Sequence, residues 1–100
     1  MTGPPAAADR PADRLGERPR LATGVRLSHD ERRQRWVLQA PERLFVLDEI
    51  AYEVIRRCDG REVAALVDEL ALSFDADRDQ IAADVLALLD DLRAKGVLAG

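Results

Sequence analysis

The stretch from Arg35 to Asp48, RWVLQAPERLFVLD, constrains the fold of this chain more than any other feature. Apolar and polar residues alternate on both sides of Pro41, as they do in two strands joined by a tight turn. Pro41 has no amide hydrogen, so it marks the turn and not the interior of a hydrogen-bonded ladder. Arg35–Ala40 and Arg43–Leu47 are therefore predicted to pair as antiparallel strands.

One more strand is predicted before this pair and three helices after it. Gly24–Ser28 also alternates, and His29–Gln34 is polar enough to connect it to the next strand, which gives a three-stranded antiparallel meander. At Asp48, a good helix N-cap, the apolar period changes from 2 to about 3.6. The three helical stripes that follow contain Ile50, Ala51, Val54, Ile55 and Cys58, then Val63, Leu66, Val67 and Leu70, then Ile81, Val85, Leu88, Leu89 and Leu92. Three strands followed by three helices predict one α+β domain.

Capping residues predict where the helices begin and end. Gly60 would end the first helix and Gly96 the third, because glycine adopts the left-handed cap conformation at little cost. Asp77 can cap the third helix, and Gln80 stands three residues later, as in a capping box. After Gly96, residues 97–98 are apolar and can fold back onto the core.

The first 23 residues differ in composition from the rest of the chain. They hold four of the five prolines and show no apolar periodicity, so residues 1–23 are predicted to form a disordered tail. Residues 24–100 would then be one small domain that gains stability from a partner, either a second copy in a homodimer or another protein. No long apolar segment follows Met1 or occurs elsewhere, so neither a signal peptide nor a membrane span is expected, and the protein is predicted to be cytoplasmic.

Charge and side-chain chemistry favour a binding protein. Residues 48–100 carry thirteen acidic side chains against six basic ones, whereas nucleic-acid binding needs clustered Lys and Arg. One histidine, His29, and one cysteine, Cys58, cannot supply the three or four ligands of a usual metal site. Cys58 lies on an apolar helical stripe and is expected in the core. Few nucleophiles and no phosphate-binding loop are present, so neither an enzyme nor a bound cofactor is expected.

Several short motifs closely resemble the PqqD family in their order and spacing. They are Gly24–Leu27 (GVRL), Pro41-Glu42, Leu47-Asp48, Ala51, Ile55, Cys58–Gly60 (CDG), Asp84-Val85, Leu89, Leu92 and Gly96–Leu98. The resemblance runs from about Pro19 to the C-terminus and implies a small winged-helix-like domain. It departs at Glu62, where many relatives have Ser or Thr before the second helix, and this puts that helix cap in doubt.

The resemblance also implies a function. A PqqD protein is a peptide chaperone in the biosynthesis of pyrroloquinoline quinone (PQQ). It would hold the ribosomal precursor peptide PqqA and present it to PqqE, a radical S-adenosylmethionine (SAM) enzyme. In such leader-recognition domains the peptide usually adds a strand to the third β-strand and packs against the third helix.

An exposed strand edge and a neighbouring groove suit this role. Backbone groups of the edge strand would give affinity, and side chains in the groove would give specificity. Alternation alone does not decide which side chains of the third strand face the core. On the third helix, Val85 and Leu88 would line the groove, with Asp84 and Arg78 on its polar rim. The predicted peptide-binding residues are Arg43, Leu44, Phe45, Val46, Leu47, Arg78, Ile81, Asp84, Val85 and Leu88, and no catalytic or metal-binding residue is predicted.

Two other functions are compatible with these elements. A winged-helix DNA-binding regulator could have the same elements but would need a basic recognition helix, and the helix after Asp77 contains four Asp against two Arg and one Lys. A leader-recognition protein of another peptide-modification pathway would share the PqqD-like features. For any of the peptide-binding functions, deletion of Met1–Pro19 is expected to leave peptide binding intact.

Overall fold

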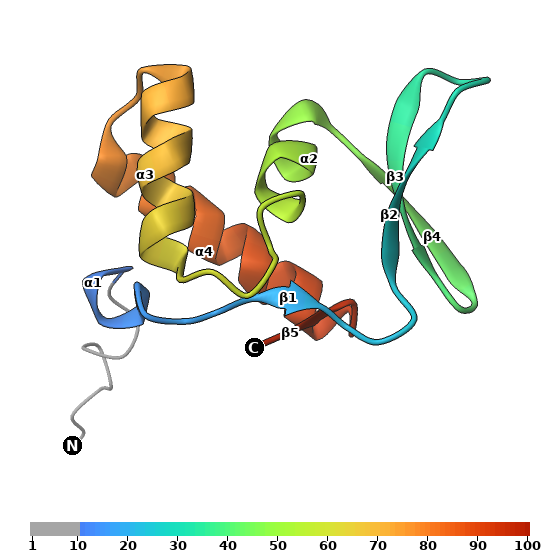
Figure 1. Cartoon of the computed structure of the whole chain (residues 1–100), viewed down its shortest axis with the longest axis horizontal. Coiled ribbons are helices and arrows are strands. Elements are labelled where there is room, and N and C mark those ends of the chain that lie inside the picture. Colours follow the sequence, from blue (N-terminus) through green and yellow to red (C-terminus); the bar gives the residue numbers. More distant parts are fainter. Residues whose placement is uncertain (1–10) are drawn as a thin grey trace.

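A computed structural model describes residues 11–100 of the chain (Figure 1). In chain order its elements are α1 (Pro11–Arg14), β1 (Arg20–Leu21), β2 (Arg26–Asp30), β3 (Arg35–Ala40), β4 (Arg43–Leu47), α2 (Glu49–Ile55), α3 (Val63–Phe74), α4 (Arg78–Ala94) and β5 (Leu98–Ala99). The antiparallel sheet β2-β3-β4 followed by three helices confirms the predicted α+β fold. In Figure 1 the sheet lies to one side of the molecule, and α2 lies between it and α3.

The sheet forms as predicted except at its first strand. β3 and β4 are joined by the two-residue turn that contains Pro41. β2 begins at Arg26, two residues later than the predicted Gly24, because Gly24 adopts a positive φ of 84° in a preceding turn. β2 also extends to Asp30 and includes His29, which was expected in the connection. His29 pairs with Trp36 across the strands, and their rings lie 4.7 Å apart.

The register shows which side chains of β4 face the core. Leu38 on β3 pairs with Phe45 and is fully buried, so Phe45 and Leu47 lie on the inner face and pack against the core. Leu44 and Val46 lie on the opposite face, with 52% and 55% of their surface exposed. The apolar side chains of β4 are thus divided between the core and the solvent.

The hydrophobic core lies between the three main helices and the inner face of the sheet. The buried residues on the helices include Val54 and Ile55 on α2, Leu66 on α3 and Leu89 on α4. α4 ends at Ala94, Gly96 turns the chain with a φ of 78°, and Val97 and Leu98 fold back onto this core, as predicted. Among the described residues, no helix is both long and apolar enough to cross a membrane.

Two predicted helix caps are confirmed. The Asp48 carboxylate accepts a hydrogen bond from the Ala51 N–H at 2.7 Å at the start of α2. Asp77 accepts one from the Gln80 N–H at 2.9 Å at the start of α4. The second half of the predicted capping box is wrong, because the Gln80 side chain donates forward to Asp84. These caps determine where α2 and α4 begin, and both helices line the site described below.

One expectation about α2 is wrong. The helix ends at Ile55 and not at Gly60, because the chain turns at residues 56–57 and Gly60 instead donates its N–H to the Pro19 carbonyl. Ile50 belongs to the predicted apolar stripe of this helix and is 54% exposed. Periodicity identified the apolar face of this helix correctly but not how far it is covered.

Residues 11–23 differ from the expected disordered tail; residues 1–10 lie outside the described part of the chain. Pro19 is fully buried, and β1 pairs with β5. The Val63 and Ala64 N–H groups at the start of α3 donate to the carbonyls of Glu17 and Leu15 at 2.8 and 2.9 Å. Glu62 makes no side-chain cap, so the N-terminal segment supplies the acceptors that this helix end needs.

Candidate functional site

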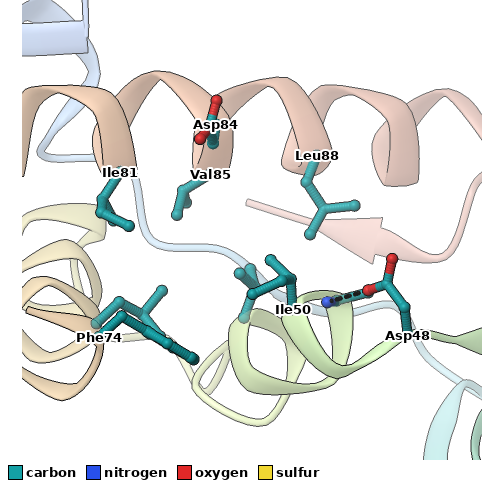
Figure 2. A pocket seen from close by; sticks show the side chains of 10 residues that line it. Asp48, Ile50, Phe74, Ile81, Asp84, Val85 and Leu88 are labelled. Atoms are coloured by element: carbon teal, nitrogen blue, oxygen red, sulfur yellow. Dashed lines mark hydrogen bonds between the residues drawn. The ribbon is translucent and has the colours of Figure 1, made fainter. Parts of the chain in front are cut away.

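An apolar cavity of about 340 Å³ opens where α2, α3 and α4 meet. Its walls are Ile50, Ala51 and Val54 from α2, Leu70 and Phe74 from α3, and Ile81, Val85 and Leu88 from α4, with Asp48 and Asp84 as its charged residues. In Figure 2, α4 lies across from α2 and the end of α3, and the apolar side chains point into the space between them. Ligand sites are commonly concave and mostly apolar with a few polar groups, so this cavity is the leading candidate site.

Exposed apolar side chains concentrate at the cavity and on β4. Among the described residues, the exposed large hydrophobic side chains are Leu44, Val46, Ile50, Leu72 and Phe74. Ile50 and Phe74 line the cavity, and Leu44 and Val46 lie on β4. Scattered exposed apolar residues are normal, but several at one place indicate an interaction surface.

Local sequence signals place the cavity walls. Asp48 starts α2 directly after β4, which brings Ile50 and Ala51 to the mouth of the cavity. Asp75 ends α3 in the left-handed conformation, with a φ of 49°, so that Phe74 is the last helical residue. Figure 2 shows Phe74 across from Ile81 at one end of the cavity and Asp48 near Leu88 at the other.

Both charged residues that line the cavity are acidic. The Asp84 Oδ1 accepts a hydrogen bond from the Gln80 side chain at 3.0 Å, and the Asp48 Oδ1 caps α2. Within residues 11–100, the second oxygen of each carboxylate accepts no hydrogen bond. Arg78, predicted on the polar rim, instead donates to Asp68 on α3 and does not line the cavity. The rim is therefore acidic, whereas a mixed rim was expected.

The structure brings together only some of the predicted site residues. Ile81, Asp84, Val85 and Leu88 line the cavity, whereas Arg43–Leu47 form the adjoining strand and do not line it. The Arg43 guanidinium donates to the Lys95 carbonyl, which fixes the turn of the hairpin to the end of α4. Six lining residues were not among those predicted from the sequence: Asp48, Ile50, Ala51, Val54, Leu70 and Phe74. A large aromatic residue directly before a polar break, as Phe74 is, was the available signal.

The outer edge of β4 is the second part of the site. Within the described part of the chain, β4 pairs with β3 alone. Ala40 and Arg43 flank the two-residue turn and form a hydrogen-bonded pair, and such pairs alternate along an antiparallel ladder. The backbone N–H and C=O groups of Leu44 and Val46 therefore point away from β3. This edge leads directly to Asp48, so the strand edge and the cavity adjoin.

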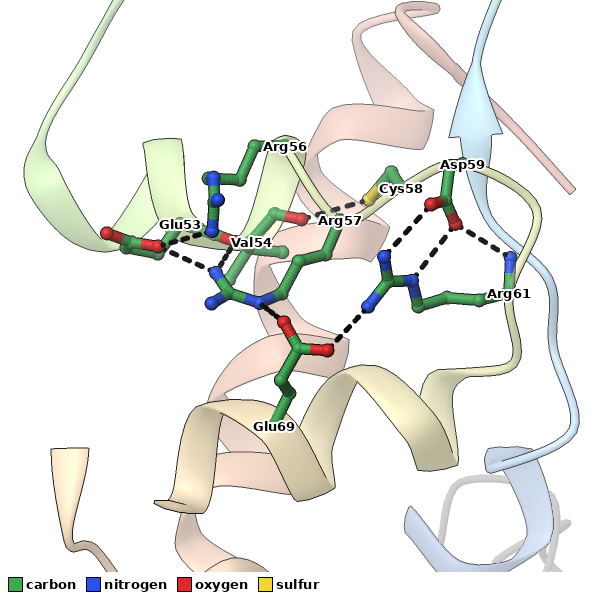
Figure 3. Close-up of polar contacts among 8 residues, drawn as sticks. All are labelled: Glu53, Val54, Arg56, Arg57, Cys58, Asp59, Arg61 and Glu69. Carbon is green, nitrogen blue, oxygen red and sulfur yellow. Dashed lines mark hydrogen bonds and ion pairs between the residues drawn. The ribbon is translucent and has the colours of Figure 1, made fainter. Parts of the chain in front are cut away.

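A charged network stabilises the α2–α3 side of the cavity (Figure 3). Arg57 is only 6% exposed, and it donates to the Glu53 carboxylate at 2.6 Å and to the Glu69 carboxylate at 2.7 Å. Burial alone would lower the pKa of Arg57, but the hydrogen bonds to Glu53 and Glu69 outweigh burial and raise it. Arg57 stays charged, and the network holds α2 at a fixed position on α3.

Cys58 is a core residue, as predicted. Its thiol is buried and donates to the Val54 carbonyl at 3.3 Å (Figure 3). Burial, together with the nearby Asp59 carboxylate, raises the pKa of Cys58 to about 12. The thiolate is the reactive form of cysteine, so this neutral thiol is unsuited to nucleophilic or redox chemistry.

The exposed strand edge and the apolar cavity define a small α+β protein with a surface suited to binding. Similarity to known proteins identifies its family. Residues 35–98 match the family model described as Coenzyme PQQ synthesis protein D (PqqD). A PqqA binding protein of Rhodopseudomonas palustris (strain HaA2) is 54% identical over 82 residues, which cover 81% of this chain and 80% of the relative. One from Xanthomonas euvesicatoria pv. vesicatoria (strain 85-10) is 53% identical over 81 residues, covering 80% and 88%.

Two solved structures are similar to this chain, each with 46% identity. The solution structure of the PqqD truncation of Methylobacterium extorquens PqqCD, described as a functional and stand-alone recognition element for ribosomally synthesized and post-translationally modified peptides, has a TM-score of 0.72. It covers 82% of this chain, which in turn covers 88% of it. The crystal structure of PqqD from Xanthomonas campestris has a TM-score of 0.56, with 80% and 90% covered. The chain belongs to the PqqD family.

Proposed function

We propose that this protein is a peptide chaperone of PQQ biosynthesis, which binds the precursor PqqA and presents it to the radical SAM enzyme PqqE. The observation that carries the proposal is the edge of β4, which pairs with no second strand within residues 11–100 and leads into the apolar cavity. The names of the relatives, which are PqqA binding proteins, support peptide binding. A binding role also agrees with the buried, neutral thiol of Cys58, the one cysteine.

Binding would proceed by strand addition to β4. The outward N–H and C=O groups of Leu44 and Val46 would pair with the backbone of an extended PqqA segment, which gives affinity with little sequence preference. Alternate PqqA side chains would lie beside Phe45 and Leu47 on the inner face, and the others beside Leu44 and Val46 on the outer face. The segment nearest Asp48 would then reach the cavity.

The balance of energies suits a reversible carrier. Each large apolar side chain that becomes fully buried contributes about 1.5–3 kcal/mol. Ordering a disordered peptide costs about 2–5 kcal/mol of the gross interaction. Two or three buried side chains plus the backbone pairing would give firm binding that still allows transfer of the peptide.

The proposed peptide-binding residues follow from this geometry. Arg43–Leu47 would act mainly through the strand, and Ile81, Asp84, Val85 and Leu88 through the cavity. Ile50 and Phe74 join the set as exposed apolar residues at the cavity. Arg78 is left out, because it pairs with Asp68 away from the cavity.

A proline substitution tests strand addition directly. Val46→Pro removes one outward N–H and no β3–β4 hydrogen bond, so the sheet should survive while PqqA binding, measured by calorimetry, weakens at least about tenfold. His29→Pro is the matched control, because the His29 N–H points outward at the opposite edge of the sheet. Equal affinity of both variants for PqqA would contradict strand addition. If the wild-type protein showed no binding to PqqA, the proposed function itself would be contradicted.

Presentation to PqqE is tested by assembly. This protein, PqqA and PqqE should elute together as one complex in size-exclusion chromatography, and Val46→Pro should deplete PqqA from it.

A homodimer paired through the same β4 edge would compete with the peptide, so added PqqA should shift such a dimer to the monomer. The DNA-binding alternative predicts a gel shift with nonspecific DNA at low salt, which the acidic rim disfavours.

A further inference from the structure

We infer that the cavity selects a particular kind of PqqA segment: a large apolar side chain next to a Lys or Arg, with Asp84 as the residue that recognises the cation. The inference rests on the proposed function and deepens it. Backbone pairing at β4 does not distinguish one peptide sequence from another. The cavity would supply the missing selectivity.

The size and lining of the cavity indicate what enters it. Its volume of about 340 Å³ is at the small end of the range of roughly 300–1,000 Å³ for ligand pockets. The walls are apolar apart from Asp48 and Asp84, so the space suits one or two apolar side chains. Ile50 and Phe74 are exposed at the cavity and would lose water contact when a side chain enters.

The charges at the cavity indicate what accompanies the apolar side chain. Both charged lining residues, Asp48 and Asp84, are acidic, and Glu49 directly follows the first of them. Arg78, the cation expected there, is paired with Asp68 on α3. A negative rim without a cation attracts a basic side chain and disfavours an acidic one.

Asp84 is better placed than Asp48 to recognise a cation. Asp48 is needed for the fold, since its carboxylate caps α2. Asp84 is exposed, and it uses one oxygen for the Gln80 side chain while the other oxygen has no hydrogen bond within the described residues. Ile81, Asp84 and Leu88 are spaced by three and four residues and share one face of α4. In Figure 2 the Asp84 carboxylate points away from the interior of the cavity, so it would meet a cation on the residue next to an apolar side chain seated against Ile81 and Leu88.

Charge removal tests the role of Asp84. Asp84→Asn keeps the size and the Gln80 hydrogen bond, and it should weaken PqqA binding in calorimetry at low salt by about three- to tenfold. Asp79→Asn, on the exposed side of the same helix, is the matched control and should change affinity by less than about twofold. Added salt should weaken wild-type binding more than Asp84→Asn binding.

A charge swap distinguishes recognition from a structural role. Each Lys or Arg of PqqA is replaced by Glu in turn; one of these peptides should bind wild type poorly and Asp84→Lys well. No such rescue, equal PqqA affinity of wild type and Asp84→Asn, or a cognate PqqA without Lys or Arg would each overturn the inference while leaving peptide binding intact. Failure of wild type to bind PqqA would instead refute the proposed function.

Filling the cavity tests the apolar part. Ala51 faces the cavity and not a packed core, so Ala51→Leu should reduce PqqA affinity at least about tenfold by filling the cavity, without lowering the free energy of unfolding. Ala87→Leu, at an exposed position of α4, is the matched control. Unchanged affinity in Ala51→Leu, with both variants folded by circular dichroism, would show that the cavity takes no PqqA side chain.

Discussion

The indole ring of Trp36 stacks on the phenol ring of Tyr52, with the ring centroids 4.3 Å apart and the planes inclined by 20°. Trp36 lies on the central strand β3 and Tyr52 on α2, so this pair joins the sheet to the helices. β4 is the neighbour of β3, and α2 forms one wall of the cavity. The stack therefore holds the two parts of the proposed peptide site in one arrangement.

Loss of this stack should affect both stability and binding. Tyr52→Ala is expected to lower the free energy of unfolding by about 1–3 kcal/mol and to weaken PqqA binding, although Tyr52 does not line the cavity. Trp36 is the one tryptophan, so its fluorescence in a urea titration measures unfolding. Tyr52→Phe keeps the stack and should behave as wild type; equal stability of all three proteins would contradict the prediction.

The N-terminal segment should matter for stability more than its composition suggests. Deletion of Met1–Pro19 removes the buried Pro19 and the carbonyl acceptors of Leu15 and Glu17 at the start of α3. It also removes the pairing of Arg14 with Asp90. We expect the free energy of unfolding to fall by at least about 2 kcal/mol in chemical denaturation.

A shorter deletion is the control for this truncation. Deletion of residues 1–10 keeps all of these contacts and should have the smaller effect. PqqA affinity of the folded longer truncation should match wild type, because neither β4 nor the cavity walls are removed. Equal stability of the two truncated proteins would show that the contacts of Leu15, Glu17 and Pro19 contribute nothing.

Asp59 should titrate well below an ordinary aspartate. Its carboxylate accepts two hydrogen bonds from the Arg61 side chain at 3.0 Å and one from the Arg61 N–H at 3.1 Å, and these lower its pKa to about 2 from 3.8 (Figure 3). The folded pKa lies below the unfolded one, so the stabilising contribution is complete above pH 3.8 and is lost as pH falls toward 2. Arg61→Gln should raise the pKa of Asp59 in an NMR titration, and an unchanged value would contradict this ion pair.

Cys58 should be protected in the folded protein. Because the thiol is buried and its pKa is raised to about 12, alkylation by iodoacetamide at about pH 8 should be limited by unfolding. In concentrated guanidinium chloride the same reaction should be fast. Mass spectrometry measures the modified fraction, and native labelling as fast as unfolded labelling would place the thiol outside the core.

Local signals were sufficient where a few neighbouring residues determine the structure. Asp77 and Gly96 indicated the two ends of α4, and Pro41 indicated the hairpin turn. The order of the segment around Pro19 was missed, because its partners are far away in sequence. Arg14 and Asp90, for example, are 76 residues apart. No local pattern distinguishes such a segment from a disordered one.

The candidate site was predicted only in part, because some of its residues depend on contacts between elements that are far apart in sequence. The α4 residues such as Val85 follow from the apolar stripe of a single helix. Ile50 lies on an equally apolar stripe, but its exposure depends on where α3 and α4 end relative to α2. Arg78 does not line the cavity and pairs instead with Asp68, which belongs to a different helix. A cavity at the meeting point of three helices requires their packing, which periodicity does not contain.

The position of α1 bears on how such a recognition module can be combined with other proteins. α1 lies at the opposite side of the molecule from the sheet (Figure 1). An enzyme joined by a tether ahead of α1 would leave the edge of β4 accessible, provided that the tether spares the contacts of residues 14–21. The same docking surface would therefore serve both a separate protein and one fused to an enzyme. In the fused form, the length of the tether would set only the local concentration of the bound peptide.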